Sequence, residues 1–212
     1  MIKFPKTFSI DLRPNCPQIY DQFTINSCVA NAACFLYKYY SKTSVEPSRL
    51  NLYNNIRKRG RDSGGYILNA LKTLKKNGIV SEKLEPYKKK LKIVLNIKSK
   101  KYKIKDYCVI PQLKIELIEC LKKNNPFIFS LLLDSNFKEI VQKSAVYNKR
   151  LGKSTTPHAL VCVGYDKLTD MFLIANSWGD TFGKKGYFVI SSNIILDSRY
   201  CYDFYYFNSG IN

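Results

Sequence analysis

The chain has 212 residues, of which 45% are hydrophobic and 24% are charged. This length is sufficient to bury a core, and the composition is that of a globular protein rather than a disordered one. Lys and Arg outnumber Asp and Glu by 35 to 16, which gives a formal net charge of +19. Such a charge favours polyanions or anionic surfaces, although lysines that are merely solvated produce the same excess, and no nucleic-acid-binding signature accompanies it.

The sequence gives no reason to expect a membrane protein or a disulfide-linked one. No apolar run reaches the ~18 residues that a membrane span needs, and we expect no secretory signal. Seven cysteines without paired spacing favour reduced thiols in a cytosol-like compartment. A single histidine and the lack of a CxxC pair argue against a zinc site, so we expect no metal and no cofactor.

The first half of the chain has the apolar spacing of helices. A helix is predicted over 27–42, with Ser27 as its N-cap and Cys28 in its first turn. Two more helices are predicted over 48–58 and 65–77, the second ended by Gly78.

A basic segment follows, from Pro86 to Lys105, with nine lysines and no acidic residue. It predicts an exposed hairpin with a short strand over 91–97. The part from Lys88 to Lys105 is then either a weak polyanion-docking patch or a solvated edge that lysines protect against strand pairing.

The second half of the chain is typical of strands. After a short helix over 114–123, strands are predicted over 127–133, 158–165, 171–176 and 186–191. The stretch 134–156 is polar and predicted to be irregular, and the tail is rich in tyrosine. We therefore predict an α+β protein with an N-terminal extension over 1–10, a mainly helical lobe over 11–105 and a mainly β lobe over 106–212.

The predicted hairpin of 158–165 and 171–176 brings the only histidine of the chain to an asparagine. A turn centred on residues 167–168 pairs positions whose numbers sum to about 334, so His158 and Asn176 lie opposite or nearly opposite each other and their side chains can touch. An amide oxygen that binds one imidazole nitrogen leaves the other nitrogen free to face a nucleophile. Taken alone, a histidine on a strand is more often a core residue, and so is a single tryptophan such as Trp178.

Cys28 is the candidate nucleophile. At a helix N-terminus, unpaired N–H groups and the helix dipole stabilise a thiolate, and a neighbouring imidazolium stabilises it further. We therefore predict a thiolate–imidazolium pair that is reactive at neutral pH. Without His158 nearby, a cysteine in an alanine-rich helix is small core filler.

Three blocks of the sequence resemble the papain/cathepsin family of cysteine peptidases. They are Gln22-Phe-Thr-Ile-Asn-Ser-Cys28, Thr-Pro-His158-Ala-Leu-Val-Cys-Val-Gly-Tyr and Asn176-Ser-Trp178-Gly. His158 and Asn176 follow Cys28 by 130 and 148 residues, within the window of about 130–150 that is known for this family. Gly64-Gly65-Tyr66 and the Glu-Pro-Tyr that ends at Tyr87 are also similar, so the resemblance covers roughly residues 11–190.

The resemblance implies a two-lobed papain-like fold and a cysteine peptidase that hydrolyses protein or peptide substrates through an acyl-enzyme. Cys28 would attack the scissile carbonyl, His158 would carry the proton and Asn176 would orient His158. Gln22 and the backbone N–H of Cys28 would stabilise the oxyanion. The implied substrate-binding residues are Gly64, Gly65, Tyr66, Ala159 and Trp178, the last of which would also cover the histidine–asparagine hydrogen bond.

The chain departs from the family just before the nucleophile. Ile25 stands where the family has a disulfide cysteine, and Asp62-Ser63 where its partner lies, so the resemblance implies that this bridge is absent. Asn26 replaces a glycine and Val29 an aromatic residue. These changes alter the approach to the oxyanion without removing a catalytic atom.

Two alternatives remain open on the same fold. One is an acyl transferase or amidase, and the other is a degenerate scaffold that binds polyanions through a basic face. The bias towards Lys, Asn, Ile and Tyr would suit a large DNA virus or an AT-rich microbe. A virion or a virus-infected cell is therefore among the expected locations.

Overall fold

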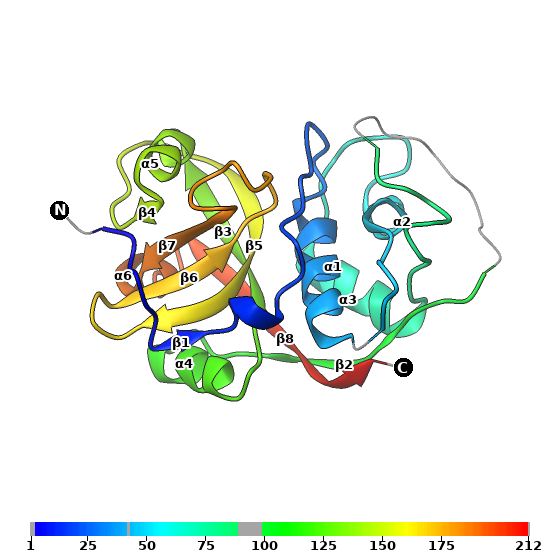
Figure 1. Cartoon of the computed structure of the whole chain (residues 1–212). Coiled ribbons are helices and arrows are strands. Elements are labelled where there is room, and N and C mark those ends of the chain that lie inside the picture. The colour runs from blue at the N-terminus through cyan, green and yellow to red at the C-terminus, as the bar shows by residue number, and fades with distance from the viewer. Residues whose placement is uncertain (1–2, 42, 89–98, 212) are drawn as a thin grey trace.

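The computed structural model describes residues 3–41, 43–88 and 99–211. Two lobes lie side by side, one built around helices and the other around a sheet (Figure 1). The helical lobe holds α1 (Cys28–Tyr40), α2 (Arg49–Ile56) and α3 (Ile67–Lys76). The predicted α+β class is confirmed, because helices dominate the first half of the described chain and strands the second.

An eight-stranded sheet forms the second lobe, in the order β2-β8-β3-β5-β6-β7-β4, with β1 paired to β5. Among the described strands all pairs are antiparallel except β4 with β7. The strands are β1 (Ile10–Asp11), β2 (Ile104–Val109), β3 (Phe127–Asp134), β4 (Val146–Tyr147), β5 (Ser154–Asp166), β6 (Met171–Ala175), β7 (Tyr187–Ser191) and β8 (Cys201–Ile211). The smaller helices are α4 (Lys114–Lys122), α5 (Phe137–Ser144), α6 (Ser192–Ile195) and a 3-10 turn, Arg13–Asn15.

Helix α1 lies between the lobes and packs against β5 (Figure 1). Residues 29–37 are all buried, as expected for a helix that is covered on every side. Ala30 and Ala33 have no exposed surface, which lets neighbouring elements approach closely. The prediction over 27–42 is confirmed to within two residues at each end, and Cys28 is the first residue of the helix.

The predictions for the shorter helices are also confirmed. Helix α2 begins after Ser48, whose Oγ accepts the backbone N–H of Asn51 at 3.0 Å. Helix α3 is followed by Gly78, which has a φ of +69° and donates its N–H to the carbonyl of Thr73, a helix end that glycine favours. Helix α4 begins at the predicted Lys114 and ends at Lys122, one residue before the predicted end.

The prediction of an irregular stretch over 134–156 is wrong. The stretch contains α5 and β4, because a few of its residues reach the core. Phe137 and Val141, one helical turn apart, are buried, and Tyr147 donates its hydroxyl to the buried carboxylate of Asp134 at 2.7 Å. The surrounding polar residues face outward and hide this short periodicity in the sequence.

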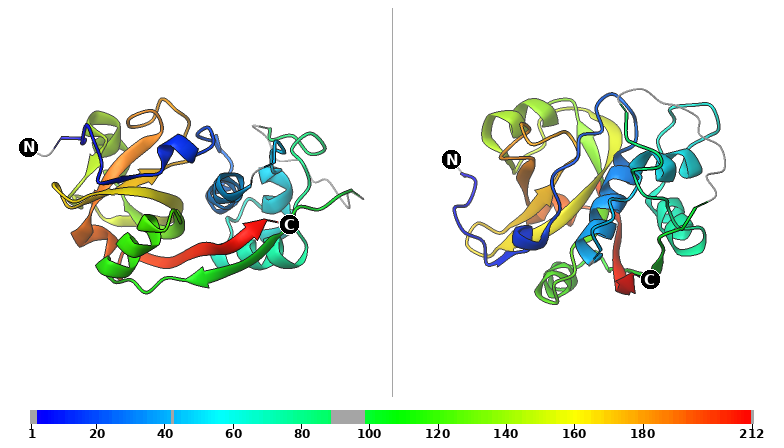
Figure 2. Two further views of the ribbon diagram at one scale, coloured as in Figure 1. Left: turned by 60° about the horizontal axis from the view of Figure 1, so that its bottom comes forward. Right: turned by 45° about the vertical axis from the view of Figure 1, so that its right-hand side comes forward.

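The tyrosine-rich tail forms a strand that the sequence analysis did not predict. Strand β8 lies between β2 and β3 in the sheet, and with β2 it runs on towards the helical lobe (Figure 2). Its Phe204 stacks on Phe129 of β3 with ring centroids 5.3 Å apart. The tail therefore contributes both to the core and to the connection between the lobes.

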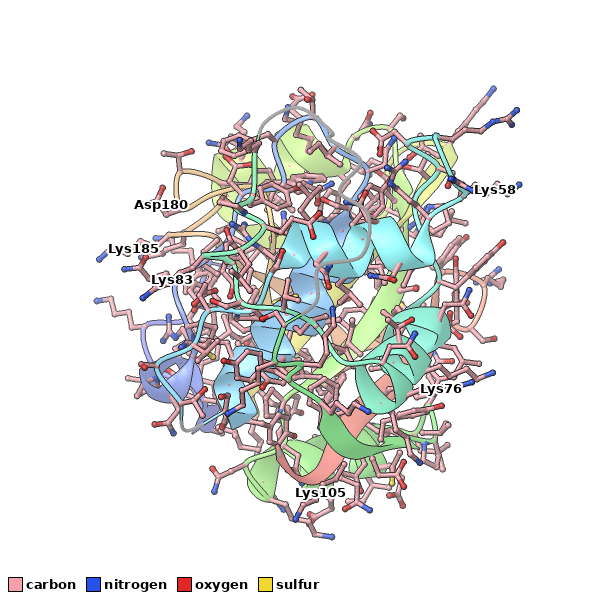
Figure 3. The ribbon with its side chains drawn as sticks, turned by 90° about the vertical axis from the view of Figure 1, so that its right-hand side faces the viewer. Lys58, Lys76, Lys83, Lys105, Asp180 and Lys185 are labelled. Carbon is pink, nitrogen blue, oxygen red and sulfur yellow. The ribbon has the colours of Figure 1, made fainter. Side chains whose placement is uncertain are left out.

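The predicted strand over 91–97 lies outside the described residues. Of the neighbouring lysines, Lys100, Lys101, Lys103 and Lys105 are exposed. Figure 3 shows Lys58, Lys76, Lys83 and Lys105 directed outward on the side of the helical lobe. The polyanion-docking patch stays a prediction, and so do the segment boundaries after residues 10 and 105.

None of the helices in the described ranges has the length and apolar character needed to cross a bilayer.

Candidate active site

A cleft of about 830 Å³ opens between the two lobes. Its lining includes every residue that the sequence analysis named for catalysis or substrate binding except Asn176, which lies behind His158 and is buried. These lining residues are Gln22, Cys28, Gly64, Gly65, Tyr66, His158, Ala159 and Trp178. Residues from the helical lobe and from the sheet lobe therefore meet in one cleft.

Cys28 enters the cleft from the first turn of α1. Burial raises the pKa of its thiol, and the backbone N–H groups of Ala159, Val29 and Cys28 itself act in the opposite direction. The sulfur thus lies against the residue that follows His158 in β5. Two of the three stabilising N–H groups come from the start of α1, as the position of Cys28 predicts.

His158 is buried and binds Asn176, with 2.7 Å between the imidazole Nε2 and the amide Oδ1. The same Oδ1 accepts the backbone N–H of Ser177 at 2.8 Å. Because a backbone N–H can only donate, the oxygen of the Asn176 amide must face both groups. It follows that Nε2 carries the hydrogen in this bond, and that Nδ1 of a neutral imidazole has its lone pair free to take a proton.

Burial lowers the pKa of His158 to about 4, although the hydrogen bond to Asn176 acts to raise it. Desolvation therefore favours a neutral imidazole and a neutral Cys28 thiol. A thiolate–imidazolium pair requires that the attraction between the two charges outweigh this effect. The predicted charged pair stays a prediction.

The predicted contact between His158 and Asn176 is present, but the hairpin register is shifted by two to three from the predicted sum of about 334. Strands β5 and β6 pair Val161 with Ala175 and Asp166 with Met171, so the numbers sum to 336 and 337, with a register shift between Cys162 and Gly164. Asn176 follows the end of β6 instead of lying directly opposite His158. The side chains still touch because diagonal neighbours in a sheet are within reach of each other.

Trp178 covers the histidine ring, with ring centroids 4.8 Å apart and planes at 33°. It is held in turn by Phe137 and Phe182, whose rings contact it edge-on at 5.8 and 4.8 Å. This packing explains why the position needs a large aromatic residue, and it keeps water from one face of His158.

Gln22 is held so that one amide hydrogen stays available. Its Nε2 donates to the carbonyl of Ile25 at 3.0 Å, and its Oε1 accepts the hydroxyl of Ser177 at 2.7 Å. The second amide hydrogen has no partner among the described residues and the side chain lines the cleft. Ser177 is a residue that the sequence analysis did not single out, although it lies within the Asn-Ser-Trp-Gly block.

The loop of Gly64 and Gly65 is tied to the segment before Cys28 by hydrogen bonds. The Asp62 carboxylate accepts the backbone N–H of Asn26 at 3.0 Å, and the Asn26 side chain donates to the Asp62 carbonyl at 3.1 Å. Tyr53 donates its hydroxyl to the same carboxylate and accepts the N–H of Gly64. These contacts link the two segments where the family resemblance implied a missing disulfide, and Cys28 and the other six cysteines are free.

A bulge in β8 brings two consecutive residues to the cleft. Ile128 pairs with Tyr205 and Ser130 with Tyr202, so a single β3 residue lies opposite two on β8. Asp203 is one of the two residues in the bulge and has a φ of +62°. Asp203 and its neighbour Tyr202 both line the cleft. Within the described chain the Asp203 carboxylate makes no hydrogen bond or ion pair, and desolvation raises its pKa.

No group of three or more His, Cys, Asp or Glu side chains that could hold a metal ion is found in the part of the chain that the structure describes. The groups around Cys28 are its thiol, the His158 imidazole and the Gln22 amide, which suit acyl chemistry at a carbonyl group.

The two lobes define a papain-like fold, with a cysteine at a helix N-terminus and a histidine, backed by an asparagine, in the cleft between them. The family model described as papain family cysteine protease matches residues 6–202. The chain therefore belongs to the papain family of cysteine proteases.

Similar proteins come from viruses and cellular organisms. An uncharacterized peptidase C1-like protein of Acanthamoeba polyphaga mimivirus is 29% identical over 87% of this chain and 68% of its own length. The gamete and mating-type specific protein A of Dictyostelium discoideum is 30% identical over 94% of this chain, which spans 46% of that protein.

Solved structures give the same result for the fold. Xylellain, a cysteine protease from Xylella fastidiosa, superposes with a TM-score of 0.81 at 29% identity, over 99% of this chain and 91% of its own. The bromelain protease from Ananas comosus, solved with the E64 inhibitor, has a TM-score of 0.75 at 23% identity over 94% of this chain and 98% of its own. The predicted papain-like two-lobed fold is thus confirmed.

Proposed function

We propose that this chain is a cysteine peptidase that hydrolyses peptide bonds through a Cys28 acyl-enzyme. The observation that carries the proposal is the orientation of His158. Its Nε2 hydrogen is committed to Asn176, and Cys28 lies against the next residue in β5, so Nδ1 is the nitrogen left to exchange a proton with the thiol.

In the first half-reaction, the Cys28 proton passes to Nδ1 of His158 and the sulfur attacks the scissile carbonyl carbon. The negative charge moves to the carbonyl oxygen, where the free amide hydrogen of Gln22 and the backbone N–H of Cys28 stabilise it. His158 then gives its proton to the leaving nitrogen as the C–N bond breaks. Donors fixed in this way act on charge that develops only in the transition state.

In the second half-reaction, a water molecule loses a proton to His158 and attacks the thioester carbonyl. The C–S bond breaks, a carboxylic acid leaves and the proton returns to sulfur. Asn176 and Trp178 hold the imidazole in one orientation throughout. Gly65, beside the cleft, would pair with the substrate backbone, with Tyr66 and Ala159 as side-chain contacts.

The test is labelling with an epoxysuccinyl thiol-peptidase inhibitor, followed by intact mass and peptide mapping. We expect one adduct, on Cys28. Cys108 is an internal control, because it is also partly exposed but does not line the cleft. His158→Ala should slow labelling of Cys28 by at least about 100-fold, as expected when a nucleophile loses its base, and should leave iodoacetamide labelling of Cys108 unchanged. Equal labelling of both cysteines by the epoxide would refute the proposal.

Hydrolysis of a peptide bond separates this proposal from an acyl transferase and from an amidase that acts only on non-peptide amides. A peptide substrate should be cleaved without any added acyl acceptor, and Cys28→Ala should abolish the cleavage. Turnover that requires an amine acceptor would favour the transferase.

Weak polyanion binding through the basic segment is a separate proposal, supported by the net charge of +19. If the proposal is right, the affinity for a DNA oligonucleotide should fall steeply as salt is added. Cys28→Ala should show the same affinity and the same salt dependence. We also infer a reducing, cytosol-like location. The seven free cysteines support it, and the similarity to a mimivirus protein suits a virus-infected cell.

A further inference from the structure

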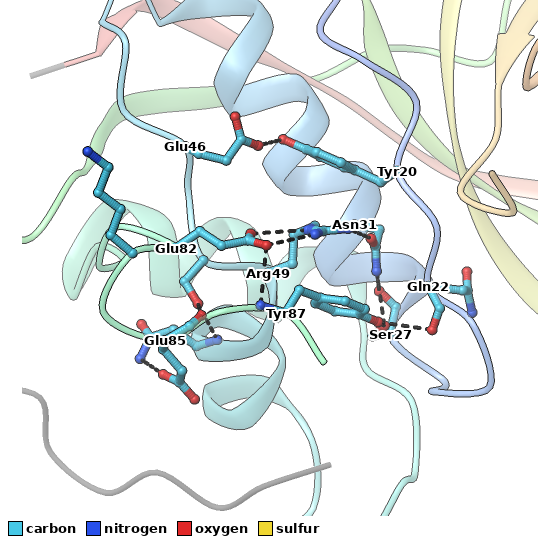
Figure 4. A network of polar contacts seen from close by, with 12 residues as sticks. Tyr20, Gln22, Ser27, Asn31, Glu46, Arg49, Glu82, Glu85 and Tyr87 are labelled. Carbon is cyan, nitrogen blue, oxygen red and sulfur yellow. Dashed lines mark hydrogen bonds and ion pairs between the residues drawn. The ribbon is translucent and has the colours of Figure 1, made fainter. Parts of the chain in front are cut away.

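Tyr87, at the start of the basic segment, reaches to the residues that precede the nucleophile (Figure 4). Its hydroxyl lies 2.5 Å from Ser27 Oγ and 3.1 Å from the backbone carbonyl of Gln22. Ser27 immediately precedes Cys28, so the hydroxyl contacts both segments that carry the two proposed oxyanion donors. In the sequence, Tyr87 is distinguished only as the end of the Glu-Pro-Tyr that resembles the family.

The direction of these hydrogen bonds is fixed by their chemistry. A carbonyl oxygen only accepts, so Tyr87 donates to Gln22 and its oxygen accepts from the Ser27 hydroxyl. The Ser27 oxygen in turn accepts the Asn31 amide at 2.9 Å. Ser27 and Asn31 have no exposed surface. The result is a one-way chain from Asn31 through Ser27 and Tyr87 to Gln22, in which each bond strengthens the next.

The Tyr87 ring is held in place by an ion pair in the helical lobe. The Arg49 guanidinium lies 4.1 Å from its centroid and binds Glu82 at 2.8 Å, and the Tyr87 backbone N–H donates to the same carboxylate at 3.2 Å. Arg49 also donates to Asn31 at 3.2 Å. Arg49 therefore fixes both Asn31, where the hydrogen-bond chain begins, and Tyr87.

We propose that Tyr87 is a positioning residue for the oxyanion site, which sets the placement of Gln22 and of the Cys28 N–H through its hydroxyl. This inference rests on the proposed function. Losing a donor outright typically costs ~10²–10³ in rate. Loosening two donors that remain present should cost less, about 10-fold in kcat with little change in KM, because the oxyanion does not exist in the ground state.

A matched control exists in Tyr20, on the other side of the same cation. The Arg49 guanidinium lies 4.3 Å from its ring centroid, and its hydroxyl binds Glu46, away from the cleft. Tyr87→Phe and Tyr20→Phe each remove one hydroxyl and keep the ring that contacts Arg49. Any general loss of stability should appear in both variants, and thermal unfolding measures it.

The experiment measures three quantities for the wild type and the two variants: kcat and KM on a peptide amide, the affinity for a peptide aldehyde, and the rate of iodoacetamide labelling of Cys28. The aldehyde forms a tetrahedral adduct whose oxygen occupies the oxyanion site, whereas alkylation by iodoacetamide displaces iodide and forms no oxyanion. We expect Tyr87→Phe to lower kcat and aldehyde affinity about 10-fold and to leave labelling within twofold. Tyr20→Phe should leave all three within twofold.

Equal kinetics for Tyr87→Phe and Tyr20→Phe would overturn the role of Tyr87 and leave the proposed function intact. A parallel loss of iodoacetamide labelling of Cys28 in Tyr87→Phe would also overturn it, because the defect would then lie in the nucleophile. A wild-type chain that neither cleaves the peptide nor binds the aldehyde would overturn both proposals.

Discussion

At the scale of single residues, the site depends on how a few buried groups fix the hydrogens of their neighbours. The Ser177 backbone N–H determines which way the Asn176 amide points, and that amide determines which nitrogen of His158 carries the hydrogen. The Ser177 hydroxyl does the same for Gln22. One serine thus sets the orientation of two of the proposed catalytic side chains.

His158 is the only histidine of the chain, so its imidazole signals in an NMR spectrum are assigned without ambiguity. In Cys28→Ser we expect it to titrate near pH 4, because burial disfavours the charged form and serine provides no anion. In the wild type a thiolate beside it should keep the imidazole protonated at pH 6. The same titration curve in both proteins would refute the charged pair.

The depressed pKa of His158 also links acid to unfolding in the Cys28→Ser variant. Between pH 6.5 and about 4 the unfolded chain binds a proton on this residue and the folded chain does not, so the free energy of unfolding falls as the pH falls. Between pH 6.5 and pH 4.5 the loss is about 2 kcal/mol. Urea unfolding of Cys28→Ser and of Cys28→Ser with His158→Gln, at pH 6.5 and 4.5, measures it. An equal loss in both variants would contradict the assignment to His158.

At the scale of elements, the bulge in β8 determines what the far end of the cleft presents to a substrate. Three neighbouring strands, β5, β3 and β8, place Ala159, Ser130 and Tyr202 side by side. Two strand spacings of about 4.8 Å each therefore separate Ala159, which lies beside Cys28, from the bulge that begins after Tyr202. A lysine or arginine side chain spans a distance of this order. The unpaired Asp203 carboxylate is then suited to a cationic substrate side chain.

We expect Asp203→Asn to lower kcat/KM about 10-fold for peptides with arginine at P2, the second residue on the N-terminal side of the cleaved bond. The reason is the loss of one partly desolvated ion pair between that arginine and the carboxylate. Matched peptides with leucine at that position should change less than twofold. Asp180→Asn is the control, because Asp180 is exposed and does not line the cleft. An equal effect of Asp203→Asn on both peptides would contradict a charge-specific role.

At the scale of the whole molecule, sequence patterns predicted the parts that depend on local periodicity. The buried α1 and the strands around His158 are examples, and the three motif blocks identified the residues that line the cleft. The bulge at Asp203 and the strand β8 depend on pairing with β3, about 70 residues earlier in the chain. The contact of Tyr87 with Ser27 joins residues 60 positions apart, which no local pattern in a single sequence reveals.

The net charge of +19 acts on any substrate before it reaches the cleft. A positive field raises the local concentration of anionic peptides, and salt removes the effect because the Debye length falls from about 14 Å at 0.05 M to about 4 Å at 0.5 M. For a peptide with three acidic residues outside the cleaved segment, kcat/KM should therefore fall about 3- to 10-fold over this range. The same peptide with glutamines in their place should change less than twofold, and epoxide labelling of Cys28 should not change. If both peptides responded equally to salt, the surface lysines would be solvated groups without a role in substrate capture.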